Sequence, residues 1–402
     1  MTNDHEGMTW RESAVREVMA LRRSHLPDRP TERVGIDRVS GRVLAEDVVA
    51  EEDVPAHDVA TMDGYAIDAS DDYPLELVES TVHPEDRPAS IDDGQAIETA
   101  TGARLPPGAD AVLKYEDARI EKGLLYGPSL DPGTYTYRRG SNVSEGERLF
   151  VAGDRLQAKD AILLADLGYD EVEVYEPFSV GVLATGTEIH EGTTPDLDTP
   201  MLLGLIESWG GEPTVEGTVP DEYDRTAGTI EDLAARYDVV VTTGGTSVGK
   251  KDYVVRALAD LGEVIFHRVR IRPGKPVAVA TVDGAIAFAI PGKPLGAYTA
   301  STLVMRPFFA GETTLPTIGV RLASAVDLGP GGFEYVVPVT VEDGTATPMG
   351  HLDSPLPVYE ETFDPSVISS STRATRADAF VVAREPLSAG ESVRAVPYAA
   401  VE

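Results

Sequence analysis

Cysteine is absent from this chain of 402 residues. Its absence excludes disulfides, thiolate zinc sites, iron–sulfur clusters and cysteine nucleophiles. Only seven histidines occur, and no two are four residues apart, which disfavours a histidine-based metal site. No apolar run approaches the ~20 residues that a membrane span needs, and no N-terminal stretch joins positive charge to an apolar core. We therefore expect a cytoplasmic protein that does not enter membranes.

Positive charge is also scarce. The chain has 34 Lys and Arg against 68 Asp and Glu, which gives a net charge of −34. Such a surface repels nucleic acid and anionic membranes, so neither is expected as a partner. One interpretation of the charge is an acidic interaction tail, but the acids are spread along the chain. We favour the other, a solvated acidic surface of a halophilic protein whose self-repulsion is screened by salt.

Lysine is the rarer of the two basic residues, with seven copies among the 34. Four of them fall between positions 250 and 293, each in or beside a glycine-rich loop. This grouping indicates anion binding, although chance placement on a solvated face would give the same count. The four are Lys250, Lys251, Lys275 and Lys293.

Hydrophobic periodicity predicts an α/β multidomain protein. Residues 8–25 carry apolar side chains at helical spacing. Residues 178–309 alternate apolar strands with helices, which predicts a doubly wound, mostly parallel sheet. Residues 73–142, and those from about 313 onward, consist of short strands divided by Pro and Gly, which is typical of β-rich domains.

The loops after the predicted strands carry the chemistry. In open parallel sheets, ligands bind beyond the carboxyl ends of the strands. Five loops should therefore converge there with hydroxyls, glycines, cations and carboxylates. Their candidate residues are Thr185, Gly186 and Glu188; Asp221; Gly244, Gly245, Thr246, Ser247, Gly249 and Asp252; Arg272, Pro273, Gly274 and Lys275; and Pro291, Gly292 and Lys293.

These residue types point to phosphate. Glycine turns allow close backbone approach, and a following helix N-terminus favours anions. Arg272 and Lys275 would neutralise a phosphate or another oxyanion. Glu188, Asp221 and Asp252 offer the hard oxygen ligands that suit Mg²⁺ bridging phosphates. Each loop alone could be a plain turn, and neither a Walker A nor a GxGxxG motif is present. The prediction therefore rests on their convergence.

The same loops carry a family resemblance. Their segments, with two upstream ones, resemble the molybdopterin molybdenumtransferase family (bacterial and archaeal MoeA and the gephyrin E-domain) in order and spacing along essentially the whole chain. The segments are TMDGYAI, TATGARLPPGADAV, ATGTEI, TTGGTSVGKKDY, RIRPGKPVAVA and AIPGKPLGA.

The resemblance implies a homodimer with four domains in each subunit. It implies a MogA/MoaB-like sheet domain, a segmented elongated α+β domain, an inserted β-rich domain and a C-terminal β-barrel-like domain. The corresponding residues are 8–27 with 178–312, 28–48 with 143–177, 49–142, and 313–402.

The resemblance also implies a reaction. The family cleaves adenylylated molybdopterin with Mg²⁺, inserts molybdate or tungstate into the dithiolene and releases AMP. A MogA/MoaB-type adenylyltransferase is the implied partner. The active site is shared between subunits, with Asp63 and Thr101 reaching across the dimer toward Glu188, Asp221 and Lys275. On their own, Asp63 and Thr101 would also fit ordinary turns.

Three positions depart from the family pattern. Lys293 stands where the family usually has Asn, Gly296 where it has Ser, and Asn142 where it has an acid. These departures keep a second hypothesis open, a catalytically impaired paralogue that carries molybdopterin or the molybdenum cofactor. A general phosphotransferase that uses ATP is a third, weaker hypothesis because no nucleotide motif is present.

Overall fold

The computed structural model describes residues 7–246 and 253–402, so the predicted site residues Ser247, Gly249 and Asp252 lie outside the described part. The chain forms two compact units, each described here by itself. Unit 1 comprises Met1–Glu32, Ser40–Val43 and Val174–Glu402, and unit 2 comprises Arg33–Val39 and Leu44–Glu173.

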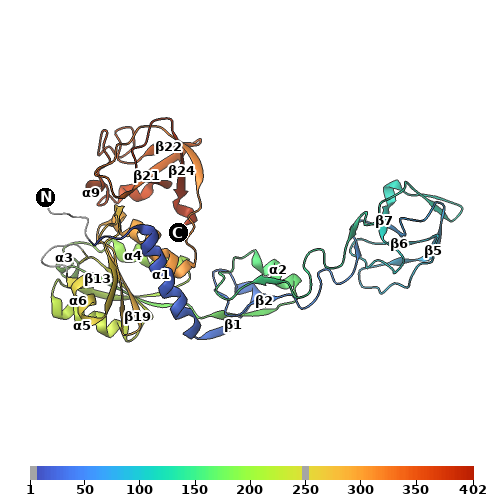
Figure 1. The fold of residues 1–402 in the computed structure, drawn as a ribbon, viewed down its shortest axis with the longest axis horizontal. Helices are drawn as coiled ribbons and strands as arrows, with labels where there is room; N and C mark the ends of the chain where they lie inside the picture. Colours follow the sequence, from blue (N-terminus) through green and yellow to red (C-terminus); the bar gives the residue numbers. More distant parts are fainter. Residues whose placement is uncertain (1–6, 247–252) are drawn as a thin grey trace. The chain divides into compact units, whose positions relative to one another are not determined.

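Unit 1 contains a six-stranded sheet in the order β14-β13-β15-β19-β18-β16. Two of its strands, β13 and β19, are labelled in Figure 1. Five strands run in one direction and β18 runs against them, because a tight Asp283-Gly284 turn with positive φ joins β18 to β19 as a hairpin. The predicted mostly parallel sheet is confirmed. The strands are β13 (Ser179–Thr185), β14 (Glu212–Val219), β15 (Val239–Thr243), β16 (Glu263–His267), β18 (Ala278–Val282) and β19 (Ala285–Ile290).

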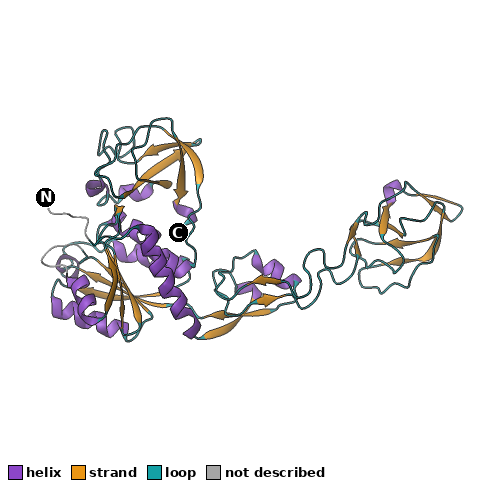
Figure 2. Cartoon of the chain, viewed as in Figure 1, coloured by secondary structure: helices purple, strands orange, loops and turns teal. Residues whose placement is uncertain are grey.

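Helices pack on both faces of this sheet (Figure 2). Along β15, Val239 and Val241 belong to the core that includes α1 and α4, whereas Val240 belongs to the core under α5 and α6. A strand buried on both faces needs an unbroken apolar run, which is what the sequence has here. The helices of unit 1 are α1 (Arg11–His25), α3 (Thr187–His190), α4 (Asp198–Ser208), α5 (Tyr223–Ala234), α6 (Tyr253–Leu261), α7 (Pro294–Ala300), the π-helical turn Ser301–Met305, α8 (Arg306–Ala310) and α9 (Pro365–Ile368).

The C-terminal part of unit 1 is a five-stranded barrel. Its strands pair in the order β21-β22-β20-β24-β23, and pairing of β21 with β23 closes the ring, as the predicted barrel-like domain requires. A short strand, β17, joins β21 from outside the ring. The strands are β17 (Ile271–Arg272), β20 (Ile318–Leu322), β21 (Glu334–Glu342), β22 (Thr345–Pro348), β23 (Ala379–Ala383) and β24 (Ser392–Pro397).

The segment 263–271 corrects one expectation. Its pattern predicts a single strand, but the structure divides it into β16 in the central sheet and β17 beside the barrel. The break falls at Arg268, whose φ of +69° lies in the left-handed region and ends the extended run. Arg272, at the end of β17, and the following loop with Lys275 are therefore attached to both the sheet and the barrel.

Unit 2 is rich in β-structure. Its main sheet has the order β7-β4-β6-β5-β9-β8, and only β5 and β6 pair in parallel. The strands are β4 (Gly64–Ile67), β5 (Leu75–Val82), β6 (Gln95–Thr99), β7 (Ala111–Lys114), β8 (Arg119–Glu121) and β9 (Leu124–Tyr126). Between residues 31 and 175, helix α2 (Asp160–Asp166) accompanies three two-stranded sheets, formed by β1 (Thr31–Gly35) with β12 (Glu171–Tyr175), β2 (Val48–Val49) with β11 (Arg148–Phe150), and β3 (Val59–Ala60) with β10 (Thr136–Tyr137).

None of the helices in the described ranges combines the length and the apolar character that crossing a bilayer would require.

Candidate functional site

A cavity of about 540 Å³ opens in unit 1 where β13, β15 and β19 end. Its size is typical of small-molecule sites. The described loops that the sequence singles out all contribute to its wall. The lining residues are Thr185, Gly186, Glu188, Ile189, Asp221, Thr243, Gly244, Gly245, Thr246, Arg272, Pro273, Gly274, Lys275, Pro276, Pro291, Gly292, Lys293, Gly296, Pro365, Ser366 and Ser369.

Two carboxylates stand on one side of the cavity. The Thr187 hydroxyl accepts a hydrogen bond from the Asp221 amide (3.0 Å), and Asp221 Oδ2 accepts one from the Thr187 amide (3.4 Å). This reciprocal pair locks the loop after β13 to the loop after β14. Glu188 lies in the first turn of α3, and its carboxylate folds back over Gly186, where a Cβ would come within 3.0 Å of Oε1. The loops after β13 and β14 thus place two carboxylates, Glu188 and Asp221, in one cavity, where each could bind a metal ion through oxygen.

Glycines bring the cavity loops into backbone contact. A Cβ on Gly244 would lie 2.8 Å from the carbonyl oxygen of Thr185, and one on Gly292 would lie 3.1 Å from the Cα of Gly244. The amides of Gly186 and Gly244 donate to carbonyls within the protein, those of Val219 and Ile290. These two glycines therefore shape the cavity, while the cationic side chains supply its charge for anions.

Arg272, Lys275 and Lys293 all line the cavity. The guanidinium of Arg272 stacks 3.8 Å from the ring centroid of Phe333, a buried residue beside the barrel. Lys293 Nζ donates to the carbonyl oxygen of Ser366 (3.1 Å). Three cations and two carboxylates thus line one cavity, a combination that suits a phosphate or an oxyanion together with a divalent metal.

The barrel supplies a wall that sequence reasoning missed. Ser369 accepts a hydrogen bond from the Leu295 amide through its carbonyl (3.0 Å), which joins the start of α7 to the end of α9. Asp364 caps α9, and hydrogen bonds from Ser366 hold its pKa below the ordinary value, with a further contribution from Lys293. The Asp-Pro-Ser sequence is a cap signature that could have revealed the helix. No local sequence pattern, however, predicts that α9 lies against the cavity.

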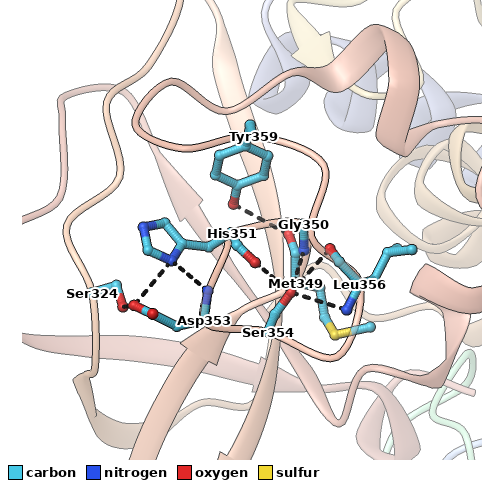
Figure 3. Close-up of polar contacts among 8 residues, drawn as sticks. All are labelled: Ser324, Met349, Gly350, His351, Asp353, Ser354, Leu356 and Tyr359. Carbon is cyan, nitrogen blue, oxygen red and sulfur yellow. Dashed lines mark hydrogen bonds and ion pairs between the residues drawn. The ribbon is translucent and has the colours of Figure 1, made fainter.

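His351 and Asp353 of the loop before α9 meet Ser324, which follows β20, as Figure 3 shows. Ser324 donates to Asp353 Oδ2 (2.8 Å), and His351 Nδ1 lies 3.2 Å from the same oxygen. A hydrolytic triad needs the serine hydroxyl on the histidine, but here the carboxylate lies between them. The Ser354 hydroxyl donates to the His351 carbonyl (2.7 Å) and accepts from the Gly350 amide (3.1 Å). The cluster therefore stabilises the loop that leads to α9.

Asp198 is a second residue that the sequence did not reveal. Its side chain is buried, with only 5% of the residue exposed, and Oδ2 accepts a hydrogen bond from the Thr243 hydroxyl (2.9 Å). The Thr243 carbonyl in turn accepts from the Thr185 hydroxyl (2.9 Å). Burial raises the pKa of Asp198, and its Oδ1 has no hydrogen-bond partner within the described residues. A buried carboxyl thus supports two threonines of the cavity wall.

Asp63 and Thr101 belong to unit 2, whereas the cavity belongs to unit 1. The structure brings these two residues together, because the Thr101 amide donates to Asp63 Oδ1 (2.7 Å). This hydrogen bond holds the pKa of Asp63 below its usual value, so the carboxylate is ionised at neutral pH.

Two of the three predicted metal ligands can be located. Glu188 and Asp221 line the cavity, and Asp252 is outside the described residues. Within residues 7–246 and 253–402, no cluster of three or more potential metal-ligating side chains forms. Mg²⁺ commonly uses one or two carboxylates together with waters and substrate phosphates, so this donor set fits that ion.

Two family models match the chain. The model described as "MoeA N-terminal region (domain I and II)" covers residues 12–168, and "Probable molybdopterin binding domain" covers 181–311. The fold and cavity therefore define an α/β protein of the molybdopterin-binding class.

Relatives agree with this assignment. A molybdopterin molybdenumtransferase of Synechococcus elongatus is 30% identical over 317 residues, 73% of this chain and 78% of the relative. One from Staphylococcus aureus is 29% identical over 295 residues, 69% of this chain and 70% of the relative. The chain belongs to the molybdopterin molybdenumtransferase family, MoeA, whose enzymes act in molybdenum cofactor biosynthesis.

Solved structures agree at the level of the fold. A molybdopterin biosynthesis MoeA protein from Pyrococcus horikoshii OT3 aligns with a TM-score of 0.76 at 24% identity, covering 97% of this chain and all (100%) of that one. A second Pyrococcus structure aligns with a TM-score of 0.71 at 29% identity, with 97% and 99% coverage. The α/β multidomain fold predicted from the sequence is confirmed.

Proposed function

We propose that this chain cleaves adenylylated molybdopterin in a Mg²⁺-dependent reaction, inserts molybdate or tungstate into the dithiolene and releases AMP. The observation that carries the proposal is the convergence of three cations and two carboxylates on one cavity of a molybdopterin-binding domain. A cytoplasmic adenylyltransferase of the MogA/MoaB type would supply the adenylylated substrate.

The cations divide the anionic substrates between them. Arg272 ends β17 and Lys275 lies in the loop that follows. Both would hold the phosphates, with Lys275 balancing the charge that develops on the departing AMP phosphate. Lys293 lies beside Ser366 of the barrel wall and would hold the metal oxyanion. Thr185 and Gly244 also line the cavity, and they would help to orient the substrate.

Glu188 and Asp221 would hold Mg²⁺ with oxygen ligands, and Asp252 would join them. The bound ion would neutralise phosphate charge and make the phosphorus–oxygen bond easier to break. Fixing of Asp221 by Thr187 supports this role, because the carboxylate is oriented before any ligand arrives.

The active site is proposed to be shared in a homodimer. Asp63 and Thr101 of unit 2 would complete the cavity of the other subunit, and the ionised, hydrogen-bonded state of Asp63 supports a role as an acceptor there. Mixing inactive Asp63→Asn and Glu188→Gln subunits tests this. Heterodimers then contain one intact site, and random exchange should restore about a quarter of wild-type activity. No recovery would mean that each subunit works alone.

AMP release is the direct test of the reaction. The purified chain is incubated with adenylylated molybdopterin, molybdate and Mg²⁺, and AMP is measured by chromatography. Wild type and the exposed-surface control Ile162→Ala should release AMP, whereas Glu188→Ala should not. Wild-type release no faster than that of Glu188→Ala would refute the proposal.

A carrier function is the second candidate, and it rests on the departures at Lys293, Gly296 and Asn142. The structure gives Asn142 another explanation, because Asn142 Nδ2 donates to Asp166 Oδ2 (3.0 Å). An aspartate at position 142 would place two carboxylates together, and they would repel each other. The Asn142 amide instead stabilises the local fold through its hydrogen bond to Asp166. Tight pterin binding without AMP release would identify a carrier.

A further inference from the structure

Among the described residues, the exposed aromatic side chains all belong to unit 2. Within the described residues, the aromatic residues classed as exposed are Tyr115 (42%), Tyr135 (38%) and Tyr137 (40%), all in unit 2. Met62, which precedes Asp63 in the chain, is also exposed. Met62, Tyr115, Tyr135 and Tyr137 are called the tyrosine surface below. Contiguous exposed apolar groups mark binding sites more often than scattered ones do.

Backbone contacts tie the tyrosine surface to Asp63. The Tyr115 amide donates to the Asp63 carbonyl (3.3 Å), and the Thr61 amide donates to the Tyr135 carbonyl (2.9 Å). Tyr137 pairs with Val59 in the two-stranded sheet of β3 and β10. The segment from 59 to 63 therefore lies beside the backbone of all three tyrosines. The Asp63 carboxylate is also close enough to the Tyr115 phenol to contribute to the rise in its pKa.

Tyr115 is held rigidly although its ring is exposed. Its phenol donates to Glu98 Oε1 (2.6 Å), and Glu98 Oε2 accepts from the Thr81 hydroxyl (2.7 Å). The Tyr65 ring meets it edge-on, with centroids 5.4 Å apart and planes at 80°. Partial burial of the phenol and its bond to Glu98 raise the pKa of Tyr115, so it stays protonated as a donor. A ring fixed in advance loses little entropy when a ligand stacks on it.

The backbone of Tyr135 has an unusual conformation. Its φ of +52° lies in the left-handed region, which a bulky residue adopts only where the surroundings enforce it. Such backbone strain concentrates at functional sites. Lys114 Nζ lies 5.8 Å from the Tyr135 ring centroid and 3.4 Å from Asp117. The Tyr135 ring therefore lies near the Lys114 ammonium, whose charge is balanced by Asp117.

We propose that the tyrosine surface and Asp63 bind the pterin ring of the substrate, with Tyr115 as the stacking platform. This inference rests on the proposed function. The chemistry favours a pterin over adenine, because the 2-amino-4-oxo edge of a pterin offers two adjacent N–H donors to a carboxylate. The corresponding edge of adenine places a ring acceptor beside its amino group. Asp63 keeps lone pairs for such donors while it accepts from Thr101.

The unit 1 cavity and the tyrosine surface of unit 2 offer different chemical groups, and so they would bind different parts of the substrate. The cavity of unit 1 gathers cations suited to phosphate and oxyanion, whereas the tyrosine surface combines flat apolar rings with an ionised carboxylate. Opposite ends of one substrate, anionic at the phosphate and hydrogen-donating at the pterin, would match these two surfaces.

Binding of free pterin (2-amino-4-oxopteridine) to the full chain tests the inference, with fluorescence quenching as the readout. Tyr115→Leu should weaken binding about tenfold, the loss expected for one stacking contact. Tyr115→Phe, which keeps the ring, should lose less than about threefold. The control Ile162→Ala, also on the surface of unit 2, should bind like wild type. AMP affinity should be the same in all four proteins.

Two results would overturn the inference: pterin binding to Tyr115→Leu as tight as to wild type, or no pterin binding to wild type. A loss of dimer in Tyr115→Leu, seen by sedimentation with pterin affinity unchanged, would assign the surface to a second copy and also overturn it. Failure of the proposed function is separable. It would appear as pterin binding that depends on Tyr115 in a protein that releases no AMP.

Discussion

The guanidinium of Arg272 rests 3.8 Å from the ring centroid of Phe333. Arg272 lines the cavity, and Phe333 is buried just before the barrel strand β21. The backbone repeats the connection, because Arg272 pairs with Tyr335 where β17 meets β21. The barrel therefore orients a cation of the cavity, and a disturbance of the barrel should be felt at the anion site.

Arg272→Lys tests this orientation. The variant keeps the charge but loses the flat stacking contact, which is worth about 0.5–2 kcal/mol. AMP affinity, measured by isothermal titration calorimetry, should fall about threefold to tenfold, with little change in melting temperature. Phe333→Leu should weaken binding in the same direction and also lower the melting temperature, because it opens a space in the core. Unchanged affinity in Arg272→Lys would show that only the charge matters.

The two described carboxylates of the cavity should govern the need for Mg²⁺. Glu188→Gln and Asp221→Asn keep the shape of each side chain but remove a charged oxygen ligand. AMP release at 1 to 10 mM Mg²⁺, roughly the range in which weak sites fill, should fall on the order of 100-fold in each variant. Both variants should melt close to wild type. A variant with full activity and an unchanged Mg²⁺ optimum would remove that residue from the metal site.

Lys293→Asn restores the residue usual in the family and removes one of three cations. Molybdate affinity at low salt should fall about threefold to tenfold, because an exposed point charge near an anion contributes about 1 kcal/mol. The difference between variant and wild type should shrink as KCl is raised. Because Lys293 also donates to the Ser366 carbonyl, Lys293→Arg serves as the control that retains the charge. Equal affinities for all three proteins would exclude a role in anion binding.

Asp198→Asn should reveal the titration of the buried carboxyl. Because burial raises the pKa of Asp198, its protonated form favours the folded state, and this contribution is lost as pH rises from the ordinary aspartate pKa through the raised one. The asparagine does not titrate and can still accept from Thr243. At pH 8 the variant should be more stable than wild type by about 1 kcal/mol in denaturant unfolding.

The difference between Asp198→Asn and wild type should shrink as the pH falls to the ordinary aspartate pKa of 3.8 and disappear below it, where the aspartate is neutral in both the folded and the unfolded state. A variant that is destabilised equally at pH 8 and below this pKa would mean that the carboxyl is needed for packing alone. Thr243→Val is the matched control, because it removes the other half of the same hydrogen bond.

Salt should stabilise the whole chain if the acidic surface is a halophilic adaptation. The net charge of −34 creates repulsion that ions screen. Between 0.1 and 2 M KCl, the melting temperature should rise by several degrees, on the order of 5–10 °C. An uncharged osmolyte in place of KCl is the control. It can stabilise the protein by being excluded from its surface, but it cannot screen the charges. A melting temperature independent of KCl would reject the adaptation.

The sequence predicted the cavity loops because strand direction determines where they meet. Once the apolar runs at 179–185, 239–243 and 285–290 are assigned as parallel strands, Gly186, Gly244 and Gly292 must follow at one sheet edge. Short-range patterns were sufficient for this part of the site.

What the sequence could not predict depends on contacts between distant segments. Ser366 and Ser369 reach the cavity only because the barrel docks there, and Asp198 is recognisable only once its burial under Thr243 is known. The break at Arg268 likewise follows from competition between two sheets for one segment. The three exposed tyrosines lie in an ordinary alternating β pattern, which does not reveal that their backbones lie beside the segment from 59 to 63.

Helix α1 has a consequence for how the chain is made. It packs against the π-helical turn and α8, which begins at Arg306, so its partners leave the ribosome long after it does. All of unit 2 is synthesised in between and can close its own sheet first. Until those partners are synthesised, the apolar face of α1 remains exposed to solvent. During this interval the nascent chain should depend most on chaperones.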